Sequence, residues 1–166
     1  VAAPDLPDAL TLLARYPNVV VLRTFSKIYG LAALRVGYAV GQSEVIDLLN
    51  RARQPFNVSS PALWAAEAAL ADGAYEEKAR RTNEEGMAQL RKGVAGFPVK
   101  ALPSQGNFIL FDCGRSSGLA LFDQFLRKGV ITRPVKNYGL EHHLRVSVGL
   151  PSENEKFLAA AQEIFK

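Results

Sequence analysis

More of the fold can be inferred from residues 19–41, which read VVVLRTFSKIYGLAALRVGYAVG, than from any other part of the sequence. Residues 19–22 form a short apolar run rich in β-branched side chains, which is typical of a strand buried on both faces of a sheet. Residues 35–41 are a second predicted strand, ended by Gly41. Because a buried strand needs neighbours on both edges, we expect the 19–22 strand to belong to a larger sheet whose other strands lie outside this chain.

The composition is that of a globular protein. Of the 166 residues, 48% are hydrophobic and 22% are charged, close to the average of folded domains. The 20 basic and 16 acidic residues give a net charge of +4, but the basic residues are scattered, so we expect no nucleic-acid partner. No stretch approaches the roughly 18 consecutive apolar residues of a transmembrane helix, so we expect no membrane partner.

The N-terminus and the cysteine content indicate where the protein works. Residues 1–5 lack the features of a signal peptide, and the absence of Met at position 1 suggests that the chain begins inside a longer protein. The single cysteine, Cys113, excludes an internal disulfide, which suits the reducing cytoplasm. Because Cys113 follows an apolar run, we predict a buried, unreactive thiol.

The rest of the chain alternates helical and extended patterns, which predicts an α/β fold. Helices are predicted over 5–15, from Ser43 and from Ser60 as N-caps, and over 75–94, 118–128 and 153–165. Further strands are predicted over 98–100, 107–111, 130–132 and 144–148. A division near Gly73 separates residues 1–72 from a smaller unit, residues 73–166.

Polar side chains follow the predicted 19–22 strand. Thr24, Ser26 and Lys27 come directly after it, and Arg35 precedes the next strand. Ligands bind at the carboxyl ends of strands in α/β sheets, and hydroxyl and guanidinium groups bind phosphate oxygens. The pattern therefore favours an anion site, although a solvated lysine in a surface loop has the same local sequence.

Residues 23–38, RTFSKIYGLAALRVGY, resemble the lysine motif of fold-type I pyridoxal-phosphate-dependent aminotransferases, and most of all the histidinol-phosphate aminotransferase family. The resemblance continues through residues 104–108 (SQGNF), 133–134 (RP), 138–140 (YGL) and 144–149 (LRVSVG). It implies that the chain is the C-terminal portion of such an enzyme. Residues 1–72 would then end the large domain that binds the cofactor, and residues 73–166 would form the small α+β domain.

The resemblance also implies roles at the cofactor, pyridoxal 5'-phosphate. Lys27 would form the Schiff base with it, because an amine can condense with the aldehyde and later be displaced by a substrate amine. Once freed, Lys27 would move a proton between the substrate α-carbon and the cofactor C4′. Thr24, Ser26 and Arg35 would cradle the cofactor phosphate.

Further residues would bind the substrate. Arg145 would hold the α-carboxylate in a two-bonded fork, although an exposed strand arginine has the same sequence pattern. Asn107 matches a position near the same carboxylate, and it also fits a turn residue at the start of a strand. Arg133 resembles the arginine that meets the substrate phosphate, and Tyr138 would form part of the pocket wall.

The implied partners are a small-molecule amino donor, a 2-oxo acid acceptor and a second subunit in a homodimer. We expect histidinol phosphate and 2-oxoglutarate as substrates, in histidine biosynthesis, and no metal site. An aromatic-amino-acid aminotransferase and a threonine-phosphate decarboxylase are related alternatives, and a non-catalytic remnant or interaction module is a third. Since the family places the aspartate that pairs with the pyridine nitrogen ahead of the lysine strand, we expect this chain alone to be inactive.

Overall fold

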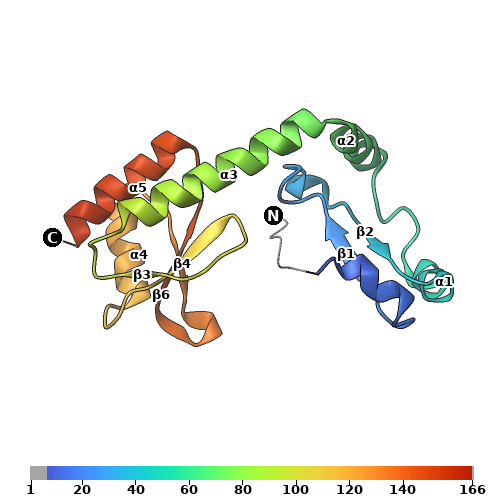
Figure 1. Ribbon diagram of the computed structural model, residues 1–166, viewed down its shortest axis with the longest axis horizontal. Coiled ribbons are helices and arrows are strands. Elements are labelled where there is room, and N and C mark those ends of the chain that lie inside the picture. Colours follow the sequence, from blue (N-terminus) through green and yellow to red (C-terminus); the bar gives the residue numbers. More distant parts are fainter. Residues whose placement is uncertain (1–6, 166) are drawn as a thin grey trace. The chain divides into compact units, whose positions relative to one another are not determined.

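A computed structural model describes residues 7–165 of the chain (Figure 1). The chain divides into two compact units, and the boundary between them in the sequence lies between Ala79 and Arg80. This boundary lies inside helix α3 (Gly73–Gly93), seven residues beyond the predicted division between 72 and 73. Assignment of the two units to a large and a small domain stays a prediction, and each unit is described by itself.

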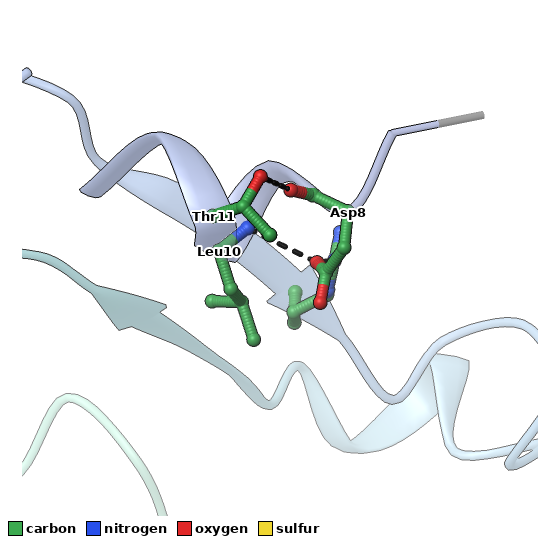
Figure 2. Close-up of polar contacts among 4 residues, drawn as sticks. Asp8, Leu10 and Thr11 are labelled. Carbon is green, nitrogen blue, oxygen red and sulfur yellow. Dashed lines mark hydrogen bonds and ion pairs between the residues drawn. The ribbon is translucent and has the colours of Figure 1, made fainter. Parts of the chain in front are cut away.

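The first unit begins with a short 3-10 helix, η1 (Ala9–Ala14). Asp8 caps it, because its carboxylate accepts a hydrogen bond from the N–H of Leu10 at 3.0 Å (Figure 2). The hydroxyl of Thr11 donates to the carbonyl of Asp8 at 2.7 Å and closes the same turn. A tight helix thus replaces the helix predicted over 5–15, whose start at residues 5 and 6 lies outside the described residues.

Two short strands follow, β1 (Val21–Thr24) and β2 (Gly37–Val40), and they pair antiparallel. The predicted 19–22 strand is therefore displaced by two residues along the chain. Burial on both faces is not found in the described residues, since Val21 is buried but Leu22 is 73% exposed. Among residues 7–165, β2 is the one strand hydrogen-bonded to β1, so the larger sheet expected for this strand stays a prediction.

The connection between β1 and β2 packs against a helix. After the short helix η2 (Ala32–Leu34), the chain passes through β2 into α1 (Ser43–Ala52) and α2 (Ser60–Ala71). Phe25 and Val36, from the ends of the connection, form a small core with Ala62 and Ala66 of α2. This core fixes both ends of the segment that carries the predicted lysine motif.

The second unit contains a four-stranded antiparallel sheet. Its strands are β3 (Lys100–Ala101), β4 (Phe108–Asp112), β5 (Arg133–Val135) and β6 (Leu140–Ser147), in the order β3-β4-β6-β5. Both central strands alternate between buried and half-exposed residues, as in a sheet with one covered face. The short helix η3 (Lys136–Tyr138) joins β5 to β6.

Helices α4 (Gly118–Arg127) and α5 (Pro151–Ile164) and the end of α3 pack on the covered face. The largest fully buried side chains of this core are those of Leu90, Ile109, Phe125 and Leu144. The buried amide of Asn154 fixes the end of β6. It accepts a hydrogen bond from the N–H of Gly149 at 3.0 Å and donates to Gln89 of α3 at 2.9 Å.

Three further sequence predictions need correction. Helix α1 is capped by Gln42 rather than Ser43, and α2 by Ser59, whose hydroxyl accepts a hydrogen bond from the N–H of Ala62. No strand covers 130–132, because the N–H of Val130 caps the end of α4 by donating to the carbonyl of Phe125 at 3.0 Å. The chain becomes extended only at β5.

Candidate functional site

Three of the predicted cofactor residues lie together at the end of β1. We call Thr24, Ser26 and Arg35 the 24–35 cradle. The hydroxyl of Thr24 donates to the hydroxyl of Ser26 at 2.9 Å and accepts a hydrogen bond from the N–H of Ser26 at 3.0 Å. These bonds form a local turn that presents two hydroxyl groups side by side.

The backbone of Arg35, the third cradle residue, is in the left-handed conformation, with φ 53° and ψ 46°. A residue with a Cβ atom pays about 1–2 kcal/mol for this conformation relative to the right-handed one. Its guanidinium donates to the carbonyl of Ala32 at 2.7 Å, which holds the side chain over the turn. Strain at a non-glycine residue marks a conformation that the surrounding structure enforces.

The cradle residues line an open groove of about 510 Å³ beside the β1–β2 ladder. Arg23 and Tyr38, which face each other across the two strands, also line it. The sequence prediction gave Arg23 no role. The ion pair of Arg23 with Asp8, at 3.7 Å, joins two half-exposed side chains. The groove is lined by two arginines and by three residues that carry hydroxyl groups, Thr24, Ser26 and Tyr38.

Lys27 is exposed at the start of the turn that leaves the cradle, and it is not among the residues that line the groove. Its carbonyl accepts a hydrogen bond from the N–H of Gly30 at 2.9 Å. The neighbouring Phe25 is only 4% exposed and packs on Tyr29, with ring centroids 5.1 Å apart. Phe25 therefore anchors the segment and leaves the amine of Lys27 in solvent.

Two predicted substrate residues meet in the second unit. Arg133 of β5 lies directly opposite Arg145 of β6 in the antiparallel ladder, so both side chains leave the same face of the sheet. On its other side, Arg145 faces Leu110 of β4. Like charges directly opposite each other destabilise a sheet by about 0.2–1 kcal/mol, and a bound anion would relieve the repulsion.

The sequence prediction missed the residue that contacts Arg145. The guanidinium carbon of Arg145 lies 5.0 Å from the ring centroid of Phe108, in the range of a cation–π interaction. The Nε atom of Arg145 is buried and has no hydrogen-bond partner among residues 7–165. Phe108 belonged to a recognised motif, but only the β4–β6 register, with Phe108 opposite Ser147, places its ring beside Arg145.

The other two predicted substrate residues are exposed. Asn107 precedes β4, and its carbonyl accepts a hydrogen bond from the N–H of Val148 at 2.9 Å, which fits the turn role that the sequence allowed. Tyr138 lies in η3 and is 65% exposed. The structure therefore brings Arg133 and Arg145 together, and it leaves Tyr138 in solvent.

Cys113 is buried, as predicted, with 3% of its surface exposed. Burial and the neighbouring carboxylate of Asp112 raise the pKa of the thiol from 9.0 to about 11. A thiol with this pKa stays protonated at neutral pH and is a poor nucleophile. Within the described part of the chain, no group of three or more His, Cys, Asp and Glu side chains could hold a metal ion.

A family model for aminotransferases of class I and II matches residues 1–161. The chain is 55% identical over 160 residues to histidinol-phosphate aminotransferase 2 of Pseudomonas fluorescens Pf-5, covering 96% of this chain and 43% of that protein. It is 54% identical to the enzyme of the same name from Pseudomonas aeruginosa, with the same coverage. The chain thus spans less than half the length of these curated relatives.

The fold is also similar to that of solved structures. The crystal structure of histidinol-phosphate aminotransferase from Sinorhizobium meliloti, in complex with pyridoxal-5'-phosphate, superposes with a TM-score of 0.82. The sequences are 30% identical, and the match covers 90% of this chain and 41% of that one. The chain therefore has the fold of this solved aminotransferase.

Proposed function

This chain belongs to the class I and II aminotransferase family, and we propose that it forms part of a pyridoxal-phosphate-dependent aminotransferase with histidinol phosphate as amino donor. The acceptor would be 2-oxoglutarate. The observation that carries the proposal is the pair of opposed arginines, Arg133 and Arg145, on one face of the sheet. Two guanidinium groups in register suit substrates with carboxylate or phosphate groups.

The 24–35 cradle fits the phosphate group of pyridoxal phosphate. The two hydroxyl groups and the guanidinium of the cradle can each donate hydrogen bonds to phosphate oxygens. Arg23 adds positive charge to the same groove. Thr24, Ser26 and Arg35 would hold the phosphate. When bound, pyridoxal phosphate supplies an aldehyde that condenses with amines and a ring that accepts the electrons of a broken C–H bond.

Lys27 is proposed as the catalytic residue. Lys27 follows Ser26 of the cradle directly in the chain, and its exposed side chain ends in a primary amine. The amine of Lys27 would take the proton from the substrate α-carbon and return it to the adjacent carbon of the cofactor. Phe25, buried beside it, would limit the movement of the backbone during this transfer.

The residues of the second unit would orient the substrate. Arg145 would bind the α-carboxylate of glutamate, and Arg133 would bind the phosphate of histidinol phosphate. Asn107 would donate a hydrogen bond to the carboxylate, and Tyr138 would contribute to the pocket wall. The exposure of Arg133, Asn107 and Tyr138 supports these roles, because a substrate must be able to reach them.

We further propose that the protein acts in the cytoplasm as a homodimer. The free, buried thiol of Cys113 suits a reducing compartment, and no helix within residues 7–165 is both long and apolar enough to cross a membrane. The first unit leaves large apolar side chains exposed, among them Leu22, Phe56 and Trp64 at 73%, 98% and 69%. Such exposure supports cover by further protein.

The proposal can be tested in a hybrid enzyme in which this chain replaces the matching segment of the Pseudomonas fluorescens relative. Borohydride reduction in the presence of pyridoxal phosphate should attach the cofactor to Lys27, as read by peptide mass spectrometry. Lys27→Ala should lose the adduct and lower the rate of transamination by at least about 10²–10⁴-fold, because the general base is removed. Lys27→Arg should be equally inactive, since it keeps the charge but has no condensable amine.

The control is Lys92→Ala, a lysine near the end of α3, which should retain full activity. A Lys27→Ala hybrid that still transaminates would contradict the assignment. The donor is tested by comparing histidinol phosphate with phenylalanine and phosphothreonine. Faster turnover of phenylalanine, or release of CO₂ from phosphothreonine, would favour the aromatic or decarboxylase alternative. A hybrid with neither adduct nor turnover would favour a non-catalytic module.

A further inference from the structure

Phe108 occupies a position that the proposed function has not used. It opens β4 and is half-buried on the same face of the sheet as Arg145. In the β4–β6 register, Leu110 lies opposite Arg145 and Phe108 opposite Ser147, so Phe108 is the diagonal neighbour of Arg145. Diagonal neighbours are within reach of each other when one side chain is aromatic and the other is long.

We propose that Phe108 is a positioning residue for Arg145. The guanidinium carbon of Arg145 lies over the ring of Phe108, 5.0 Å from its centroid, and this contact fixes the orientation in which Arg145 meets the substrate anion. This inference deepens the proposed function and rests on it, because it concerns how Arg145 performs the binding role assigned above.

The surroundings of Arg145 explain why an aromatic ring suits this position. Its cross-strand neighbours are Leu110 and Arg133, neither of which can accept a hydrogen bond through its side chain. No ion pair or hydrogen bond holds its guanidinium within the described residues, and its Nε is buried without a partner. Within the described residues, the ring of Phe108 is therefore the contact that holds the guanidinium of Arg145 in place.

A ring and a carboxylate would hold an arginine in different ways. A carboxylate accepts hydrogen bonds from the in-plane N–H groups of the guanidinium and would compete with the substrate anion for these groups. An aromatic ring attracts the cation through its face and leaves the donor edge free. Phe108 can thus oppose the repulsion from Arg133 while the fork of Arg145 stays available for the substrate.

The test compares three variants of the hybrid enzyme. Phe108→Leu keeps an apolar side chain but removes the ring, Phe108→Tyr keeps the ring, and Phe122→Leu is the matched control. Phe122 is also half-buried, but it belongs to α4 and packs against the core. We measure KM and kcat for glutamate, whose α-carboxylate is assigned to Arg145.

Phe108→Leu should raise the KM for glutamate about three- to tenfold with kcat changed less than twofold, the loss expected when a partly buried cation–π contact is removed. Phe108→Tyr should restore the wild-type KM, and Phe122→Leu should leave it unchanged. An unaltered KM in Phe108→Leu would overturn the proposal, because the contact would then have no effect on substrate binding. An equal rise of KM in Phe122→Leu would also overturn it, because the effect would then come from the loss of packing in general.

A second measurement separates this inference from the proposed function. In the 166-residue chain, the buried Nε–H group of Arg145 should give an NMR signal displaced upfield by the ring current of Phe108. The signal is assigned by its loss in Arg145→Lys. Phe108→Leu should move it downfield, and Phe108→Tyr should not. If the wild-type hybrid fails to transaminate, the proposed function fails, and this NMR comparison still decides the Phe108 proposal. An unmoved signal in Phe108→Leu would overturn it.

Discussion

At the scale of single residues, Cys113 gives the chain a defined response to alkaline pH. The folded protein holds the thiol proton up to about pH 11, whereas the unfolded chain releases it near 9.0. Between these values the unfolded state binds fewer protons, so the free energy of unfolding falls as the pH rises. Burial contributes most of this difference, and the charge of Asp112 adds to it.

We therefore predict that the wild-type chain loses about 1–2 kcal/mol more stability than Cys113→Ala between pH 8.5 and roughly pH 11. The measurement is urea unfolding of both proteins at several pH values in this range. Other groups titrate here too, so only the difference between the two curves is informative. Parallel curves would show that the thiol is not protected in the folded state.

Single residues also show where sequence reasoning succeeds and where it ends. That Thr24, Ser26 and Arg35 lie together could be predicted, because all three line one groove beside β1, as their positions after the predicted strand suggested. Their role as an anion site stays a prediction. The left-handed backbone of Arg35 could not be predicted, since arginine has no preference for that conformation and only the surrounding folded structure enforces it. The contact of Phe108 with Arg145 depends on strand register, which no local pattern contains.

At the scale of elements, two glycines of α3 differ in what surrounds them. A Cβ atom on Gly86 would lie 2.5 Å from a methyl group of Val148 and 2.9 Å from the amide nitrogen of Asn154. A Cβ atom on Gly73 would meet no atom within 4 Å. The close approach at Gly86 lets α3 pack against the end of β6, the strand that carries Arg145.

Gly86→Ala should lower the free energy of unfolding by about 1–3 kcal/mol, since the added methyl group displaces the Asn154 amide from its hydrogen bonds. Gly73→Ala should leave stability unchanged or raise it by up to about 1 kcal/mol, because alanine favours the helix. Both values come from denaturant unfolding. The packing argument is wrong if the two substitutions have equal effects.

Element boundaries were harder to predict than element types. Most helices and strands were placed within a few residues, because apolar periodicity reflects which face is buried. The errors occurred where a neighbour overrides the local pattern. Val130 has a strand-like sequence around it, but its N–H is needed to end α4. Residues 19 and 20 are as apolar as Val21, yet they lie before the first pair of the β1–β2 ladder.

At the scale of the whole molecule, the two units have cores of different size. The core of residues 80–165 contains twelve buried residues, whereas that of residues 7–79 contains four. Burial of apolar surface is the main source of stability, so the second unit should hold its structure more strongly. The sequence predicted two units, but their unequal cores became visible only with the packing.

Hydrogen exchange of the 166-residue chain should reflect this difference. Backbone amides of β4 and β6 should exchange much more slowly than those of β1 and β2, because opening them requires the larger core to unfold. Mass spectrometry of peptides from both regions, with the same labelling times, provides the measurement. Equal protection of the two ladders would mean that the chain unfolds as one cooperative body.

The facing arginines of β5 and β6 also lower the stability of the sheet when no substrate anion is bound to them. Replacing Arg133 or Arg145 by threonine would remove the cross-strand repulsion and strengthen the ladder, because threonine favours strands and pairs well across them. The same change would remove a donor from the proposed substrate site. Substitutions chosen for thermal resistance alone would therefore converge on these two positions and weaken substrate binding there.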